Sequence, residues 1–369
     1  MILSSLLLSA VLEAEAADQP AGAAAGSTAG TEEKKKNKNK DKDTNGDGKK
    51  NEDGEDSKDA GNDGKKKDAP TVKVGGLIFA HYGYDLTEGA NSANSFDLDR
   101  AYVSASSSMT KRLAAKITLD AGRLSDQAAD TKIRVFIKNA WLEASNGDEM
   151  KARFGVVDTG YISYTEQFVG GRYIAKFLGD HEGVLSTADI GINVQGKVAD
   201  GLFDYHAAII NGEGYSSPEV DAGKTAQGRA TVDPLAKAKG LALPITGFVS
   251  YSLPAKGAEG VLVYAGALGF KIPNLVVWAE YLGESTGGVS AGGFSGIVSP
   301  RLDDVGGILL RVDRWDPNAK TDGDSVLSII GGINHDFLEK TSVSLTYERA
   351  QDEAGNAEHG VFVRMQAGF

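Results

Sequence analysis

From Thr71 to the last residue, the chain is a succession of short segments in which apolar and polar residues alternate. Around residue 190, for example, Ile190, Ile192 and Val194 fall on one side of an extended chain, while Asp189 and Asn193 fall on the other. A period of two residues is typical of a β-strand with two different faces. No helical period competes with it, so we expect residues 71–369 to be all-β.

Turn residues divide this region into sixteen predicted strands. We expect them at 72–84, 95–109, 113–124, 134–146, 150–159, 188–199, 203–212, 228–236, 243–252, 260–271, 274–285, 293–299, 305–317, 324–337, 341–352 and 359–369. An even number of antiparallel strands lets the sheet close into a barrel with both of its ends on the same side.

Short and long connections alternate along the predicted strands. The short ones are 109–112, 146–150, 199–202, 272–274 and 337–340. The long ones are 85–94, 125–133, 160–187, 213–227, 286–292, 318–323 and 353–358. Short turns at one end and long loops at the other are typical of transmembrane β-barrels, whereas a soluble β-sandwich or propeller has no reason to sort its loops in this way.

The last predicted strand has one apolar face that ends on an aromatic residue. Arg364 and Gln366 occupy its other face, and the apolar face consists of Val361, Val363, Met365, Ala367 and Phe369. No run after residue 12 approaches the roughly 20 apolar residues of a spanning helix, and the mean hydropathy is -0.24. In a transmembrane barrel only every second residue of a strand is apolar, so the mean hydropathy resembles that of a soluble protein. We therefore predict a transmembrane antiparallel β-barrel of sixteen strands. For this segment taken alone, an ordinary edge strand is the alternative.

The N-terminal part of the chain has a different composition. Residues 1–16 combine a short apolar run with an Ala14-Glu15-Ala16 cleavage pattern, which predicts a signal peptide although no basic residue precedes the run. Residues 17–70 are rich in Lys, Asp, Asn and Gly and lack large apolar residues after the leader, so we expect a disordered segment. Residues Asp43 to Gly48 match the first part of an EF-hand loop, but Gly54 stands where the final Glu would be. The favoured interpretation of this stretch is therefore a solvated linker.

Composition excludes several classes of function. The chain has no cysteine, which rules out disulfides, thiol catalysis and Cys-ligated metal sites. Its net charge of -12 argues against a nucleic-acid partner. We expect no cofactor and no metal.

Five stretches resemble the outer-membrane porins, and more narrowly the phosphate-selective porin O/P family. They are 95–122 (SFDLDRAYVSASSSMTKRLAAKITLDAG), 186–198 (STADIGINVQGKV), 309–318 (LLRVDRWDPN), 329–350 (IIGGINHDFLEKTSVSLTYERA) and the terminal Phe369. The resemblance implies a water-filled diffusion channel in the bacterial outer membrane, a homotrimer in contact with outer-membrane lipid, that passes small hydrophilic solutes or anions. It also implies a periplasmic location for residues 17–70 and recognition of Phe369 by the barrel assembly machinery.

The longest predicted connection, 160–187, carries both aromatic and charged residues. In porins of this size the third long loop folds into the barrel, and the resemblance implies the same role here. Tyr161, Tyr164, Phe168, Tyr173 and Phe177 would then pack against the wall. The charged residues expected at the constriction are Glu166, Arg172, Lys176, Asp180 and Glu182. An outer loop packed over a neighbouring subunit is the alternative.

The polar faces of the predicted strands give a map of charges inside the barrel. The candidates for the pore lining are Lys73, Arg100, Lys116, Arg153, Arg311, Arg364, Asp189 and Glu280. The first four of these cations and Arg364 come from neighbouring strands once the barrel closes, so they predict a basic sector facing acidic groups, with a field across the pore. Scattered charges that merely keep the channel wet are the alternative, and strict phosphate selectivity would need a ladder of Arg and Lys.

Two further functions of other classes are open. A barrel enzyme would need a nucleophile beside a histidine, and only His181, between Asp180 and Glu182, is suggestive. A structural or tethering protein would act through residues 20–70. Trp278 points inward by its phase, so a carbohydrate-binding role also stays open.

Overall fold

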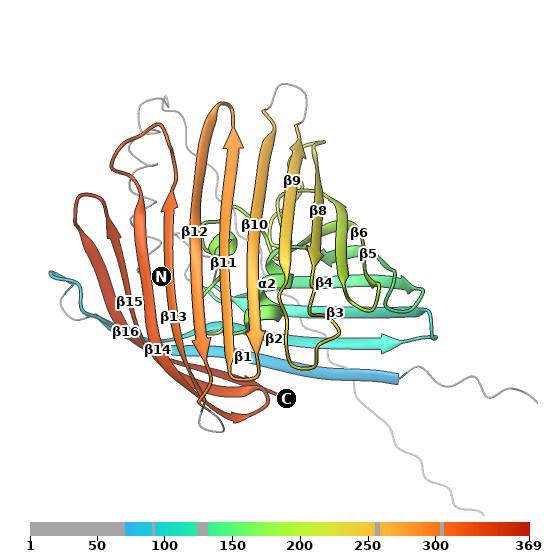
Figure 1. Cartoon of the computed structure of the whole chain (residues 1–369), viewed down its shortest axis with the longest axis horizontal. Helices are drawn as coiled ribbons and strands as arrows, with labels where there is room; N and C mark the ends of the chain where they lie inside the picture. The colour runs from blue at the N-terminus through green and yellow to red at the C-terminus, as the bar shows by residue number, and fades with distance from the viewer. Residues whose placement is uncertain (1–70, 91–92, 124–131, 255–258, 303–305) are drawn as a thin grey trace, which may run out of the picture. The chain divides into compact units, whose positions relative to one another are not determined.

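A computed structural model describes residues 71–369 except 91–92, 124–131, 255–258 and 303–305. Predictions for the signal peptide and for the segment 17–70 therefore lie outside the described residues. Within them the chain forms sixteen antiparallel strands, and each strand pairs with the next in sequence until β16 pairs with β1 and closes the barrel. Figure 1 shows the succession from β1 in blue to β16 in red. This confirms the predicted fold class.

The first eight strands are β1 Thr71–Asp85, β2 Asn94–Ser108, β3 Leu113–Gly122, β4 Arg134–Ser145, β5 Lys151–Asp158, β6 Ala188–Val198, β7 Phe203–Ile210 and β8 Lys224–Val232. The second eight are β9 Ile245–Leu253, β10 Val261–Ile272, β11 Leu275–Thr286, β12 Val289–Pro300, β13 Gly307–Asp316, β14 Val326–Leu338, β15 Thr341–Asp352 and β16 Ala357–Gly368. Two short helices, α2 Ile162–Val169 and α3 Leu178–His181, lie between β5 and β6. No helix in the described parts of the chain is long and apolar enough to cross a membrane.

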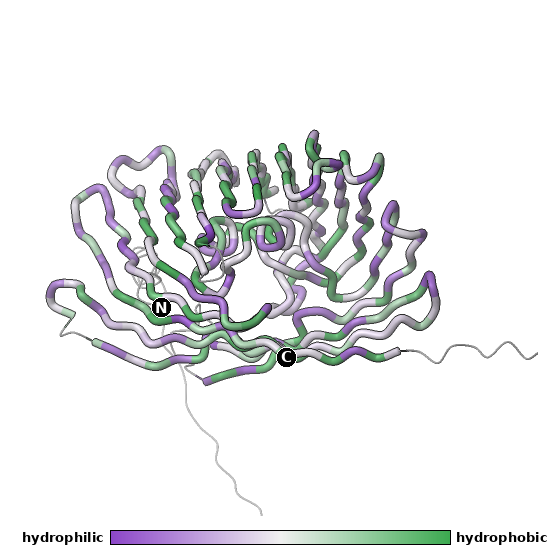
Figure 2. The backbone as a smooth tube through the Cα atoms, turned by 60° about the horizontal axis from the view of Figure 1, so that its bottom comes forward, coloured by the Kyte–Doolittle hydropathy of each residue, from purple (hydrophilic) through white to green (hydrophobic). Residues whose placement is uncertain are grey.

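The barrel has its apolar side chains outside and its polar side chains inside. On β6, Ile190 and Ile192 are 48% and 46% exposed, whereas Asp189 and Asn193 on the opposite face are 2% and 1% exposed. Figure 2 shows the resulting alternation of hydrophilic and hydrophobic residues along the strands. A wall of exposed apolar side chains is unfavourable in water, so this exterior suits contact with lipid.

The predicted eighth strand, 228–236, is displaced from the observed β8, Lys224–Val232. The predicted range included Pro234, which has no N–H to give to the neighbouring strand. In the structure the Asp233 carboxylate instead accepts hydrogen bonds from the backbone N–H groups of Leu235 (2.9 Å) and Leu243 (2.9 Å). This turn ends β8 and makes 233–244 a long connection at the end where short turns were expected.

The predicted twelfth strand, 293–299, is too short, and the long loop predicted at 286–292 is wrong. The observed β12 begins at Val289, and only Gly287 and Gly288 separate it from β11. Both glycines have a positive φ (56° and 80°), which is the conformation of a two-residue hairpin turn. The alternation of short and long connections therefore holds along most of the barrel and fails at these two hairpins.

Gly155 on β5 is a position where a side chain would disturb the wall strongly. Its φ is 125°, and a Cβ would lie 2.1 Å from the carbonyl oxygen of Ala140 on β4. We expect Gly155→Ala to destabilise the barrel by about 2 kcal/mol or more, because both the backbone and the strand pairing must shift. The measurement is the temperature at which the purified barrel loses its folded band, when samples are heated to increasing temperatures before gel electrophoresis.

Gly247→Ala is the matched control, since a Cβ at Gly247 meets no atom within 4 Å. Equal stability of the two variants would contradict the account of Gly155.

Candidate functional site

The connection 159–187 folds against the inner wall of the barrel. Its two ends are joined by Thr159, whose N–H donates to the Thr187 carbonyl (3.1 Å) and whose hydroxyl donates to the Ser186 carbonyl (2.5 Å). Side chains of this loop enter two buried clusters with inward-facing residues of the strands. The first cluster contains Tyr161, Ile162, Leu178 and Leu185 of the loop with Phe248, Val263, Ala265, Leu282 and Trp315 of the wall.

The second cluster contains Tyr173, Ile174 and Phe177 of the loop with Phe79, Ala267, Trp278, Ile297 and Leu309. The wall residues of the two clusters belong to β1 and to strands from β9 to β13, so the loop rests on a broad part of the interior. Figure 1 shows α2 next to β10 and β11, in agreement with the contacts between α2 and β11.

Three polar contacts fix the loop to the wall. The Tyr161 hydroxyl donates to Glu280 Oε2 (2.6 Å), and Arg229 Nε donates to the Gly160 carbonyl (3.0 Å). Arg311 Nη1 donates to the Lys176 carbonyl (2.6 Å). Glu280 and Arg311 are only 5% and 4% exposed. We predicted both as pore-lining residues, whereas in the structure they hold the loop.

Four of the five predicted constriction charges form one network within the loop. Arg172 donates to Glu166 (2.8 Å) and to Asp180 (2.8 Å), and Lys176 lies 3.6 Å from Asp180. Burial lowers the pKa of the Lys176 ammonium, an effect that Asp180 opposes and the cations Arg172 and Arg100 reinforce. Arg100 of the wall is therefore close enough to act on the loop network.

The fifth residue predicted at the constriction, Glu182, lies beside His181, with 3.8 Å between His181 Nε2 and Glu182 Oε1. Burial raises the pKa of Glu182 to about 7; Asp313 adds to the increase and Arg311 opposes it. Burial, with Arg311, lowers the pKa of His181 to about 4, so this histidine stays neutral at neutral pH.

The raised pKa of Glu182 predicts that the stability of the loop 159–187 depends on pH. Because the pKa of Glu182 is raised in the folded loop, its contribution to loop stability is complete below about pH 4.5 and is lost as the pH rises through about 7. We expect current noise from loop motion to increase between pH 6 and pH 8, as measured in planar bilayers. Glu182→Gln should show the low-pH behaviour throughout; an unchanged pH profile in this variant would contradict the assignment to Glu182.

A second connection, 211–223, also reaches into the interior. The Tyr215 hydroxyl donates to Asp120 Oδ2 on β3 (2.7 Å), and Asp120 pairs with Arg100 Nη1 on β2 (3.1 Å). Asp189, predicted to line the pore, accepts hydrogen bonds from the N–H groups of Gly212 (2.8 Å) and Gly214 (3.3 Å) and so holds this loop. The sequence gives no signal that separates Tyr215 from other loop tyrosines.

Lys138 is a second residue that sequence reasoning missed. Its Nζ lies 4.9 Å from the ring centre of Tyr102 and 5.8 Å from that of Tyr215. The register between β3 and β4 shifts between Thr118 and Leu119, whose partners are Asn139 and Ile137, so Lys138 is an extra residue in a bulge. A strict alternation of inward-facing and outward-facing residues therefore does not hold at Lys138.

The predicted basic sector is divided into local ion pairs. Arg153 pairs with Glu143 (2.8 Å) and Asp158 (3.3 Å), and Arg364 pairs with Glu348 (2.6 Å). Lys73 is exposed near the start of β1. It precedes Leu77, the first residue of β1 that pairs with β16. Lys116 remains half-buried, with no carboxylate within 4.0 Å among the residues that the structure describes. The geometry is therefore closer to distributed lumen charges than to one basic sector facing an acidic one.

Trp278 is fully buried and does not reach the open lumen. Its ring packs against those of Phe168 (5.4 Å between centres) and Tyr164 (6.3 Å). The inward phase expected for Trp278 is correct, but the loop covers the ring, which removes the basis for a carbohydrate-binding role there.

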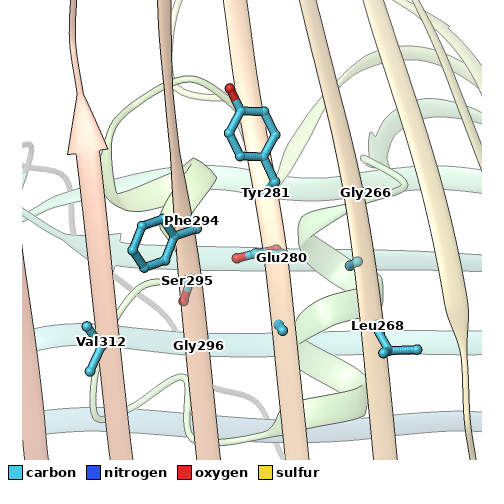
Figure 3. A pocket seen from close by; sticks show the side chains of 10 residues that line it. Gly266, Leu268, Glu280, Tyr281, Phe294, Ser295, Gly296 and Val312 are labelled. Carbon is cyan, nitrogen blue, oxygen red and sulfur yellow. The ribbon is translucent and has the colours of Figure 1, made fainter.

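On the outer face of the same wall, small residues leave an apolar cavity of about 470 Å³. Figure 3 shows Leu268, Tyr281, Phe294 and Val312 around it, with Glu280 on the strand between. The wall is thin here because Gly266, Ala279 and Gly296 line the cavity.

No protein-family model and no curated protein matches this chain. Solved structures of outer-membrane barrels do match it. An anion-selective porin from Comamonas acidovorans is 12% identical with a TM-score of 0.60, over 81% of this chain and 100% of that one. OmpF of Salmonella typhi, solved with daunomycin, is 10% identical with a TM-score of 0.61, over 81% and 97%.

OmpT of Vibrio cholerae in a trimer form is 14% identical with a TM-score of 0.57, over 82% of this chain and 100% of that one. At these identities the comparisons establish the porin-like fold. The narrower phosphate-selective O/P family is not among these three matches.

Proposed function

We propose that this chain is an outer-membrane porin, a water-filled channel for the passive diffusion of small hydrophilic solutes and ions. The observation that carries the proposal is a closed barrel with an apolar exterior and a polar interior, into which the loop 159–187 folds. Such an interior solvates ions and polar solutes that the lipid excludes.

The loop 159–187 forms the constriction of this channel. Buried aromatic residues and the three contacts to Glu280, Arg229 and Arg311 hold it against the wall and limit its movement. The charged network of Arg172, Glu166, Lys176 and Asp180 then meets a passing solute.

The charges at the constriction favour a weak preference for anions. Arg100, Lys138, Arg172 and Lys176 supply four cations, against the three carboxylates of Asp120, Glu166 and Asp180. The fourth carboxyl group, Glu182, has a pKa raised to about 7 by burial, so it carries only part of a negative charge at neutral pH. The structurally similar porin from Comamonas acidovorans is anion-selective, which agrees with this preference. Strict phosphate selectivity is not favoured, because Arg100, Arg153 and Arg364 are each paired with a carboxylate.

We also propose that the chain assembles as a homotrimer in the outer membrane, as the trimer form of Vibrio OmpT suggests. Residues 17–70 would lie in the periplasm, and Phe369 would be recognised by the barrel assembly machinery. In the structure the Phe369 backbone pairs with Gly76 on β1 (N–H to carbonyl oxygen 3.1 Å in both directions), so this residue takes part in closing the barrel.

Liposome swelling tests the proposed function. Purified protein in liposomes should admit small sugars and amino acids at rates that fall steeply with solute size, whereas protein-free liposomes should stay impermeable. Swelling that is equal with and without the protein would refute a diffusion channel.

A further inference from the structure

A cavity of about 810 Å³ lies between α2 and the inner faces of β3 to β8. It extends toward the barrel end that carries residues 146–150 and 233–244, since Asp148, Asp233 and Ala242 are in its lining. Three lysines, Lys116, Lys151 and Lys197, line it from the strands, and Ser163 and Gln167 line it from α2. It is separate from the charged network of Arg172 and Asp180, which does not contribute to its lining.

The carboxylates in this cavity already have hydrogen-bond donors. Asp158 accepts from Asn139 (2.9 Å) and Arg153 (3.3 Å), and Asp204 contacts Arg229 (2.5 Å) and Lys197 (3.4 Å). Asp233 accepts two backbone N–H groups, as described for the end of β8, and Asp148 accepts from Lys151 (2.7 Å). A solute therefore meets few free acceptors here.

Donors, in contrast, remain available. In the described chain, Lys116, Ser163 and Gln167 have no hydrogen-bond or ion-pair partner. An ammonium carries three N–H donors, so Lys151 and Lys197, each contacting one aspartate, keep further donors. The surplus of donors and positive charge fits a solute rich in acceptors, which means an anion.

The aromatic rings of the cavity are not open for sugar stacking. The Arg153 guanidinium lies 4.3 Å from the centre of the Trp141 ring, and the Arg229 guanidinium lies 4.2 Å from that of Tyr164. The third ring of the lining, Phe168, packs against Trp278 (5.4 Å between ring centres), so little aromatic surface is left for an uncharged sugar. The neutral donors Ser163 and Gln167, placed opposite the lysines, suit hydroxyl groups.

We propose that this cavity is a binding subsite for small hydroxylated carboxylates, with Lys116 and its neighbouring lysines holding the carboxylate and Ser163 and Gln167 holding the hydroxyl groups. The proposal rests on the proposed function and specifies a solute class for it. Binding here concentrates the solute beside the constriction and raises its flux at low concentration.

The experiment measures the block of chloride current by gluconate in planar bilayers, with glucose as the uncharged comparison. Gluconate should reduce the current of the wild-type channel with a saturable dependence on concentration, and glucose at the same concentrations should not. Lys116→Gln should raise the half-blocking concentration about tenfold, the effect of one charge-assisted contact. Gln167→Leu should raise it about threefold.

Lys111→Gln is the control, because Lys111 is exposed in the turn between β2 and β3 and does not line the cavity. Its half-blocking concentration should equal that of the wild type. An open channel that gluconate and glucose affect alike, or a Lys116→Gln variant with unchanged block, would overturn the subsite and leave the diffusion channel standing. A protein without conductance would instead refute the proposed function.

Discussion

Replacing Arg311 with Met should loosen the constriction loop and raise the noise and mean conductance of the channel. Arg311 pairs with Asp313 (2.6 Å) and donates to the Lys176 carbonyl (2.6 Å), and both charged residues are about 5% exposed or less. Removing one partner of a buried pair leaves an uncompensated charge, with a typical cost of about 3–5 kcal/mol. Single-channel recording and thermal unfolding of the purified barrel provide the two measurements.

The double variant Arg311→Met with Asp313→Leu separates the two effects of this change. It removes both charges, so much of the lost stability should return. The contact to the Lys176 carbonyl is still absent, so the conductance noise should remain. Recovery of quiet, wild-type currents in the double variant would contradict the role of Arg311 in holding the loop.

The second large effect is expected at Lys138. Lys138→Glu replaces a cation near Tyr102 and Tyr215 with an anion, which changes the charge of the constriction by two units. In a narrow pore with low-dielectric walls such a change acts strongly on permeating ions. We expect the reversal potential under a KCl gradient to move from weak anion preference to cation preference, with a permeability ratio changed by about tenfold.

Lys111→Glu is the matched control for this experiment, because it introduces the same charge change at an exposed turn. A similar shift in both variants would mean that the overall charge of the protein, rather than the constriction, determines selectivity. An unchanged reversal potential in Lys138→Glu would place Lys138 away from the path of the ions.

The barrel is well predicted from the sequence, because its exterior requires apolar side chains and its interior polar ones, in alternation along each strand. A slip of one residue would turn a strand such as β6 inside out, placing Asp189 and Asn193 in lipid. The misplaced strands are those where local chemistry decides instead: Pro234 ends β8, and the pair Gly287 and Gly288 makes a tight turn.

The candidate site is less predictable, because alternation tells which side a residue faces and not what it contacts there. Arg100 and Arg153 face inward as expected, but their carboxylate partners depend on the pairing of neighbouring strands. Glu280 and Arg311 face inward too, yet the folded loop covers them. Lys138 escapes the pattern because a bulge changes the phase of β4.

The most direct measurement uses the absence of native cysteines. A single cysteine at Gln167, exposed on α2 and in the lining of the inner cavity, would be the only thiol in the protein. A charged methanethiosulfonate reagent should then lower the single-channel conductance in a clear step, whereas a cysteine at Leu268 on the outer wall should give no change. Absence of conductance, or no step after labelling at position 167, would contradict a water-filled channel narrowed by the inward loop.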